Sequence, residues 1–186
     1  MLSNLNCENS PTIYFGNQVK LFRQFISAKD AAFFLDTAKS LSKRKVICKA
    51  DNVSFSEQAI PPDHELHNFF SSKQILAISQ ELLNVQSTLK RMLCWTSIYQ
   101  KHEFINPHKD VSGDLQLLLC LQNDGFKDQG LFCFQFENET HKIFLNPGDL
   151  LFFEATKIEH YTTPIFESET NPNPYRTVAV ARQFFS

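Results

Sequence analysis

The chain has 186 residues, of which 42% are hydrophobic and 20% charged, and its formal net charge is -2. This composition is typical of an ordinary folded protein and gives no sign of disorder. The length fits a single domain, residues 1–186, with one substantial core. A net charge near zero supplies no global field to hold a polyanion, so we expect no nucleic-acid partner.

The cysteine pattern indicates a reducing compartment. The chain has five cysteines, Cys7, Cys48, Cys94, Cys120 and Cys133, which is an odd number without CxxC spacing. Three of the five lie inside apolar runs. We therefore expect buried free thiols, with Cys120 and Cys133 close together but unbonded. No stretch looks like a signal peptide or approaches the ~18 apolar residues of a membrane span, so we expect a cytoplasmic protein with no membrane segment.

The first half of the chain, residues 1–92, is predicted to be a helical cover. One helix should follow Ser27, which has capping-box spacing to Asp30, with Phe34, Leu35, Ala38 and Leu41 on one face. A second helix is expected from about Lys73 to Arg91, with a buried stripe of Ile75, Leu76, Ile78, Leu82, Leu83 and Leu89. The stretch between them, 51–70, contains the Pro61–Pro62 pair and is expected to be loop-rich.

After Met92 the helical period disappears and short β-rich runs follow, separated by turn signals. The runs are MLCWTSIYQ, LQLLLCLQ, GLFCFQF, HKIFLN, DLLFFEA, IEHYTTP and RTVAVARQFF. Many short strands at even spacing predict a barrel or sandwich. Several runs are apolar on both faces, so one face can line a barrel while the other packs under two helices. The predicted fold class is mainly β with N-terminal helices, the core spanning residues 93–186.

The stretch INPHKD is a candidate metal site. His108 and Asp110 lie two residues apart, so on a strand they would project to the same side. His160 lies on a late run, and early and late strands are neighbours in a closed barrel. An HxD pair alone also occurs by chance as solvated side chains. Two imidazoles and one carboxylate on one face, with other positions open, suit non-haem Fe(II).

The order of these pieces resembles the Fe(II)/2-oxoglutarate-dependent oxygenases, which share a double-stranded β-helix (a jelly-roll, cupin-like barrel). The resemblance covers roughly residues 93–185 and carries Tyr99, HxD, GDLLFF, His160 and the RTVAVAR strand. It implies that His108, Asp110 and His160 hold iron, that Arg176 clamps the distal carboxylate of 2-oxoglutarate, and that Tyr99 hydrogen-bonds the same cosubstrate. A guanidinium fork matches a carboxylate bidentately.

The resemblance also implies a reaction: Fe(II), 2-oxoglutarate and O2 hydroxylate or otherwise oxidise an unactivated C–H bond, releasing succinate and CO2. Because the HxD carboxylate is intact, halogenation is disfavoured. A small metabolite or an amino-acid-like molecule is the expected substrate. Its identity, the site of oxidation and the oligomeric state stay open.

Three alternatives remain at this point. A protein or peptide side-chain hydroxylase is the first, through the likeness of INPHKD to prolyl hydroxylases. An AlkB-like nucleic-acid demethylase is the second, although the RxNxTxR strand of that group reads RTVAVAR here. A cupin-like ligand-binding module without activity is the third. The insert at 165–175 is either a lid or a tolerated loop, His64 and His67 are expected to be solvated, and His102 could reach the pocket rim.

Overall fold

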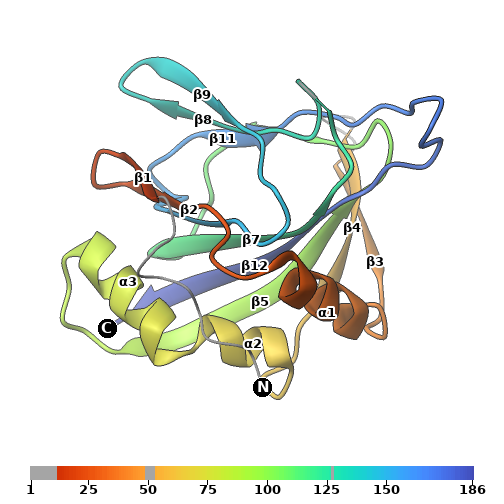
Figure 1. The fold of residues 1–186 in the computed structure, drawn as a ribbon. Coiled ribbons are helices and arrows are strands. Elements are labelled where there is room, and N and C mark those ends of the chain that lie inside the picture. The colour runs from red at the N-terminus through yellow and green to blue at the C-terminus, as the bar shows by residue number, and fades with distance from the viewer. Residues whose placement is uncertain (1–11, 49–52, 127) are drawn as a thin grey trace.

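The computed structural model describes residues 12–48, 53–126 and 128–186. These residues form a mostly β structure with two antiparallel sheets and three α-helices (Figure 1). The helices are α1 (Ala28–Ala38), α2 (Glu65–Phe70) and α3 (Lys73–Leu83). The strands are β1 (Thr12–Phe15), β2 (Val19–Phe22), β3 (Arg44–Cys48), β4 (Val53–Ala59), β5 (Leu89–Tyr99), β6 (Ile105–His108), β7 (Leu115–Asn123), β8 (Phe132–Phe136), β9 (Glu139–Ile143), β10 (Leu150–Phe153), β11 (His160–Thr162) and β12 (Arg176–Phe185).

The elements stack in three layers. The larger sheet has eight strands in the order β1-β2-β10-β7-β12-β5-β4-β3, and the smaller has the order β6-β11-β8-β9. In Figure 1 the helices lie along one face of the larger sheet and the smaller sheet lies on the other side. One apolar cluster fills the space under the helices and another fills the space between the sheets.

The central strands are apolar on both faces because each face meets a different layer. On β10, Leu150 and Phe152 belong to the cluster under the helices, whereas Leu151 and Phe153 belong to the cluster between the sheets. Successive side chains of a strand point to opposite faces, so a central strand of a three-layer structure must read as a continuous apolar run. The expectation drawn from these runs is confirmed.

The N-terminal cover differs from the prediction in its extent. Helix α1 begins after Ser27 as expected, and the Ser27 hydroxyl accepts a hydrogen bond from the Asp30 backbone N–H. The second predicted helix is too long, because α3 ends at Leu83. Asn84 takes a left-handed conformation (φ 52°) that closes the helix, and Leu89 begins strand β5.

Two further corrections concern strands. The stretch expected to be loop-rich holds β4 and α2 on either side of the Pro61–Pro62 pair. Strands β1 to β4 also lie within residues 1–92, so this part is a cover of three helices, not two, together with four strands of the larger sheet. Strand β2 is only four residues long and buried throughout, a pattern whose period cannot distinguish a strand from a buried helix.

No helix among the described residues has the length and apolar character needed to cross a bilayer. Cys94, Cys120 and Cys133 are buried and unbonded, as predicted for these three thiols. Cys7 and the side chain of Cys48 lie outside the described part of the chain.

A buried carboxylate joins the N-terminal segment to the central sheet. Asp149 is fully buried in the turn before β10. Its oxygens accept hydrogen bonds from the backbone N–H of Gln24 (2.9 Å) and of Asn146 (2.9 Å), and one of them receives the Arg23 guanidinium at 2.6 Å. Gly148 precedes it with φ 96°, and a Cβ there would lie 2.3 Å from the Ile26 carbonyl oxygen, so the turn requires glycine.

Replacing Asp149 with alanine should lower the free energy of unfolding by about 3 kcal/mol, because the change leaves several buried hydrogen-bond donors without their acceptor. Urea unfolding followed by circular dichroism measures the loss. Asp36→Ala is the matched control: it removes an exposed carboxylate paired with Lys39 and should change stability by under about 0.5 kcal/mol. Equal effects of the two substitutions would contradict the anchoring role of Asp149.

Candidate active site

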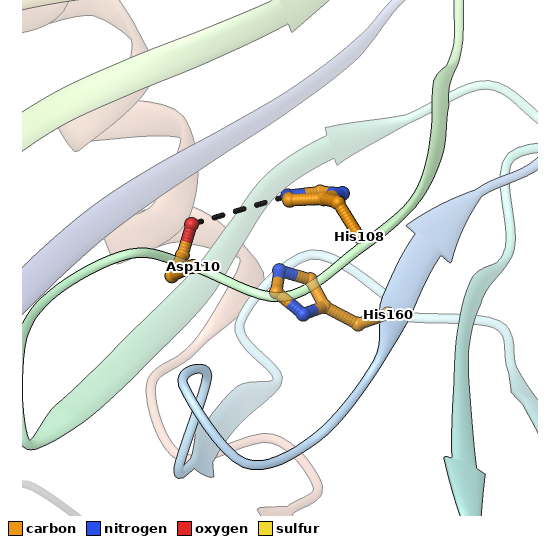
Figure 2. A group of neighbouring side chains, drawn as sticks. All are labelled: His108, Asp110 and His160. Carbon is orange, nitrogen blue, oxygen red and sulfur yellow. Dashed lines mark ion pairs between the residues drawn. The ribbon is translucent and has the colours of Figure 1, made fainter.

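The three predicted metal ligands come together at the edge of the smaller sheet. His108 is the last residue of β6 and pairs directly with His160, the first residue of β11, so that their ring centroids lie 4.3 Å apart. Asp110 lies beyond the end of β6 and not on it, and its backbone N–H donates to the Ala155 carbonyl (2.9 Å). Figure 2 shows the three side chains pointing toward one another, with His108 Nε2 3.9 Å from Asp110 Oδ1.

The donor set fits a divalent transition metal. One ligand atom of each residue lies within 4.8 Å of the other two. Two atoms that bind one ion at about 2.1 Å are at most about 4.2 Å apart, so small side-chain rotations complete the set. Nδ1 of His108 lies 2.8 Å from the Asn106 carbonyl and Nδ1 of His160 lies 3.0 Å from the Ile158 carbonyl. Each Nδ1–H can donate there, which leaves the Nε2 lone pair for a metal.

The protonation state of His160 also favours metal binding. The pKa of its imidazole is lowered to about 4; burial is the main cause, the charges of His108 and Arg182 act in the same direction, and the Ile158 carbonyl and Asp110 act against it. The ring is therefore neutral at physiological pH. A neutral imidazole is the form that binds metal ions.

The triad forms part of the wall of a cavity of about 200 Å³ between the two sheets. The wall also includes both arginines of the last strand and Tyr99. Its lining residues are Phe55, Glu57, Trp95, Ser97, Tyr99, Ile105, His108, Asp110, Gln116, Leu118, Phe132, His160, Thr162, Arg176, Val178, Val180 and Arg182. A concave, largely apolar space with a few convergent polar groups is the usual form of a small-molecule site.

Arg176 is a buried cation without a counter-ion. It is the first residue of β12, pairs with Tyr99 of β5 and is 1% exposed. Its Nε and Nη1 have no hydrogen-bond partner among the described residues, and none of their carboxylates lies within ion-pair distance. Burial lowers the pKa of the guanidinium, yet an arginine stays protonated in proteins. A buried charge left unpaired is costly, so this end of the cavity is suited to an anion.

Tyr99 lies beside this cation. Its ring centroid is 5.2 Å from the Arg176 guanidinium carbon and it stacks on Phe55 at 5.3 Å. Burial raises the pKa of the phenol, and the Arg176 charge and a hydrogen bond with Ser97 act against that rise. The hydroxyl therefore remains a potential hydrogen-bond donor inside the cavity.

Arg182 lies on the same face of β12, six residues after Arg176, and lines the same cavity. Its Nη2 lies 2.6 Å from Asp110 Oδ2, and its Nε and Nη2 donate to Gln116 Oε1 at 3.0 and 2.8 Å. Asp110 Oδ2 nevertheless accepts no hydrogen bond from the described residues, so the pair is an ion pair that leaves lone pairs for a metal ion. Of the two arginines, Arg182 is engaged and Arg176 is not.

Several cavity residues were not singled out from the sequence. Ser97 and Trp95 lie two and four residues before Tyr99 on β5, so counting alternate residues back from the tyrosine would have found them. Glu57 was hidden because its strand was taken for a loop. Gln116 gave no signal of its own, since a single glutamine in an apolar strand has no distinguishing pattern.

The 165–175 insert, His102 and His64 lie outside the cavity wall. The cavity wall takes no described residue from the 165–175 insert, so nothing in the structure makes this segment a lid. His102 does not reach the wall either, and its Nε2 pairs with Glu167 of the insert at 2.9 Å. His64 is not simply solvated: its Nδ1 accepts a hydrogen bond from the Leu66 backbone N–H and caps α2.

No protein-family model and no curated protein sequence matches this chain. Solved structures do match over most of its length. A prolyl-4-hydroxylase from Pseudomonas putida has a TM-score of 0.71 at 14% identity, covering 91% of this chain and 93% of its own. An oxidoreductase of the 2OG-Fe(II) oxygenase family from Burkholderia pseudomallei has a TM-score of 0.70 at 12% identity, covering 89% and 84%. HygX from Streptomyces hygroscopicus, solved with nickel, 2-oxoglutarate and hygromycin B bound, has a TM-score of 0.66 at 11% identity, covering 89% and 82%.

The chain therefore has the fold of the 2-oxoglutarate- and Fe(II)-dependent oxygenases, which confirms at the level of the fold the resemblance drawn from the sequence.

The metal-free protein should show a strongly depressed His160 titration. Because the folded pKa, about 4, is below the ordinary value of 6.5, the unfolded chain takes up the proton first, and this residue's contribution to stability is lost as pH falls from 6.5 toward 4. Nitrogen-15 NMR of the imidazole, assigned with His160→Gln, measures the midpoint. A midpoint near 6.5 would show that the ring is not desolvated.

Proposed function

We propose that this protein is an oxygenase that uses Fe(II), 2-oxoglutarate and O2 to oxidise an unactivated C–H bond, releasing succinate and CO2. The observation that carries the proposal is the unpaired, buried Arg176 in the same cavity as His108, Asp110 and His160. A metal-binding triad alone would suit several functions. An anion-binding arginine in the same cavity suits a dicarboxylate that reaches from the metal to the guanidinium.

Each residue then has a role that its surroundings support. His108 and His160 would hold the metal through Nε2 and Asp110 through a carboxylate oxygen, all from one side. Arg176 would hold the distal carboxylate of 2-oxoglutarate, and the Tyr99 hydroxyl would donate to the same group. When bound, the iron with its cosubstrate and O2 would supply the oxidising power.

Apolar side chains form much of the rest of the cavity wall. Leu118, Phe132, Val178 and Val180 present apolar surface around the triad. Apolar walls strengthen the electrostatic contacts inside and protect reactive species from water. We further infer that the paired sheets of the C-terminal half form a double-stranded β-helix, on the support of the fold similarity.

For the substrate, we infer a small metabolite or an amino-acid-like molecule, since the cavity is small. The structural neighbours differ in what they bind, because one is a prolyl-4-hydroxylase and another holds hygromycin B. A peptide side chain is the second candidate, favoured by the first of these neighbours. The net charge of -2 and the valines that replace Asn and Thr in RTVAVAR speak against nucleic acid. The buried free thiols support a cytoplasmic location.

Removing any one triad ligand should abolish turnover and leave the fold in place, because the metal is not part of the hydrophobic core. Succinate formation and O2 uptake that both require Fe(II) and 2-oxoglutarate would also separate an oxygenase from a cupin-like binding module. Mn(II) binding by electron paramagnetic resonance should weaken at least about tenfold in Asp110→Ala and His160→Ala. His141→Ala, which removes a histidine outside the cavity wall, is the control. Full metal binding by His160→Ala would show that the triad is misassigned.

Arg176→Ala should weaken 2-oxoglutarate binding roughly a hundredfold, because it removes a desolvated, charge-assisted contact. The fluorescence of Trp95, the sole tryptophan, reports on the cavity that it lines. Arg182→Ala should leave this affinity nearly unchanged, since Arg182 is already engaged by Asp110 and Gln116. A larger loss for Arg182→Ala than for Arg176→Ala would reverse the assignment of the two arginines.

A further inference from the structure

A second carboxylate, besides Asp110, lines the cavity. Glu57 lies on β4, where it pairs in register with Ser97 of β5 on one side and with Arg44 of β3 on the other. It belongs to the cavity wall, and its side chain is 21% exposed. The triad and the Arg176 site do not use it.

The oxygen atoms of the uncharged polar side chains in the wall already accept hydrogen bonds from within the protein. The Ser97 hydroxyl accepts from Trp95 Nε1 (3.1 Å), and the Thr162 hydroxyl accepts from the Ile105 backbone N–H (3.1 Å). Gln116 accepts from Arg182. With the metal and cosubstrate groups assigned and Arg182 paired with Asp110, Glu57 is the charged side chain of the described wall that is left for a substrate.

The ion pair that Glu57 forms with Arg44 can be exchanged for one with another cation. Glu57 forms an ion pair with Arg44, whose side chain is 77% exposed and does not line the cavity. An ion pair with one highly exposed member is screened by solvent and holds weakly. The cavity wall is largely apolar, and a cation held inside it would be attracted to the same carboxylate more strongly than a cation in bulk solvent.

We propose that Glu57 is a specificity-determining residue, which recognises an ammonium or guanidinium group of the substrate by taking it in exchange for Arg44. This inference rests on the proposed function and narrows its substrate class to cationic small molecules or cationic amino-acid side chains. A substrate cation at Glu57 would leave the uncharged part of the molecule to face the triad.

The test uses a matched pair of probes, n-butylguanidinium and the neutral n-butylurea, titrated into the full-length protein loaded with Mn(II) and 2-oxoglutarate. Trp95 fluorescence reports occupancy of the cavity. The wild-type protein should bind the cation about tenfold more tightly than the urea, as expected for a hydrogen bond to a charged group. Glu57→Gln should bring the two affinities together. Arg44→Ala should keep or widen the preference, because it removes the competing cation and leaves the carboxylate.

Equal affinity for the two probes in the wild-type protein, including no response to either, would overturn the inference. So would a loss of preference in Arg44→Ala as large as in Glu57→Gln, because Glu57 would then act only as the partner of Arg44 in the β3–β4 pair. Circular dichroism checks that both variants are folded. Basal 2-oxoglutarate turnover, measured without either probe, tests the proposed function separately. If the wild-type protein shows no such turnover, the proposed oxygenase function is wrong. If turnover is present but the protein shows no preference for the cation, only the role of Glu57 is wrong.

Discussion

The register between β6 and β11 is the constraint on which the site depends. It sets His108 directly opposite His160, and a slip of one residue would turn either imidazole to the other face of the sheet. Two features fix the register. The pairing is irregular between His160 and Thr162, and the Thr162 hydroxyl accepts from the backbone of Ile105, the first residue of β6. Irregular pairing of this kind is common next to active sites, where it aims side chains.

The last strand supplies the charge pattern of the cavity. β12 carries an arginine at each end of one face, with small apolar residues between them. The Arg182 guanidinium pairs with the Asp110 carboxylate of the triad, whereas the Arg176 guanidinium has no counter-ion among the described residues. The same strand thus presents a satisfied cation and an unsatisfied one to one space. Arg176 is 1% exposed, so water does not compensate its charge, and leaving it unpaired costs more free energy than it would at the surface.

The C-terminal half could be predicted from the sequence and the N-terminal half only in part. The strands after Met92 are short β-rich runs separated by turn residues, and the packing of one sheet face under the helices could be inferred from runs that are apolar on both faces. HxD, His160 and the two arginines could be placed because each lies on or beside such a run. Strands β2 and β4 were missed, since β2 is too short to show a period and β4 lies in a stretch that was taken for a loop. Glu57 was missed for that reason, and the engagement of Arg182 by Asp110 depends on distances between elements that no local pattern encodes.

The link between Asp149 and Gln24 also constrains how the protein is made. The two residues are 125 positions apart. Strand β2 ends two residues before Gln24 and pairs with β10, which begins directly after Asp149. At translation rates of about 5–20 residues per second, the N-terminal segment therefore waits about 6–25 s before its partner strand is synthesised. During that interval the apolar strand β2 lacks the strand that later covers its edge. An unpaired apolar edge is a site of aggregation, so the nascent chain has a period in which it depends on dilution or on chaperones to remain competent to fold.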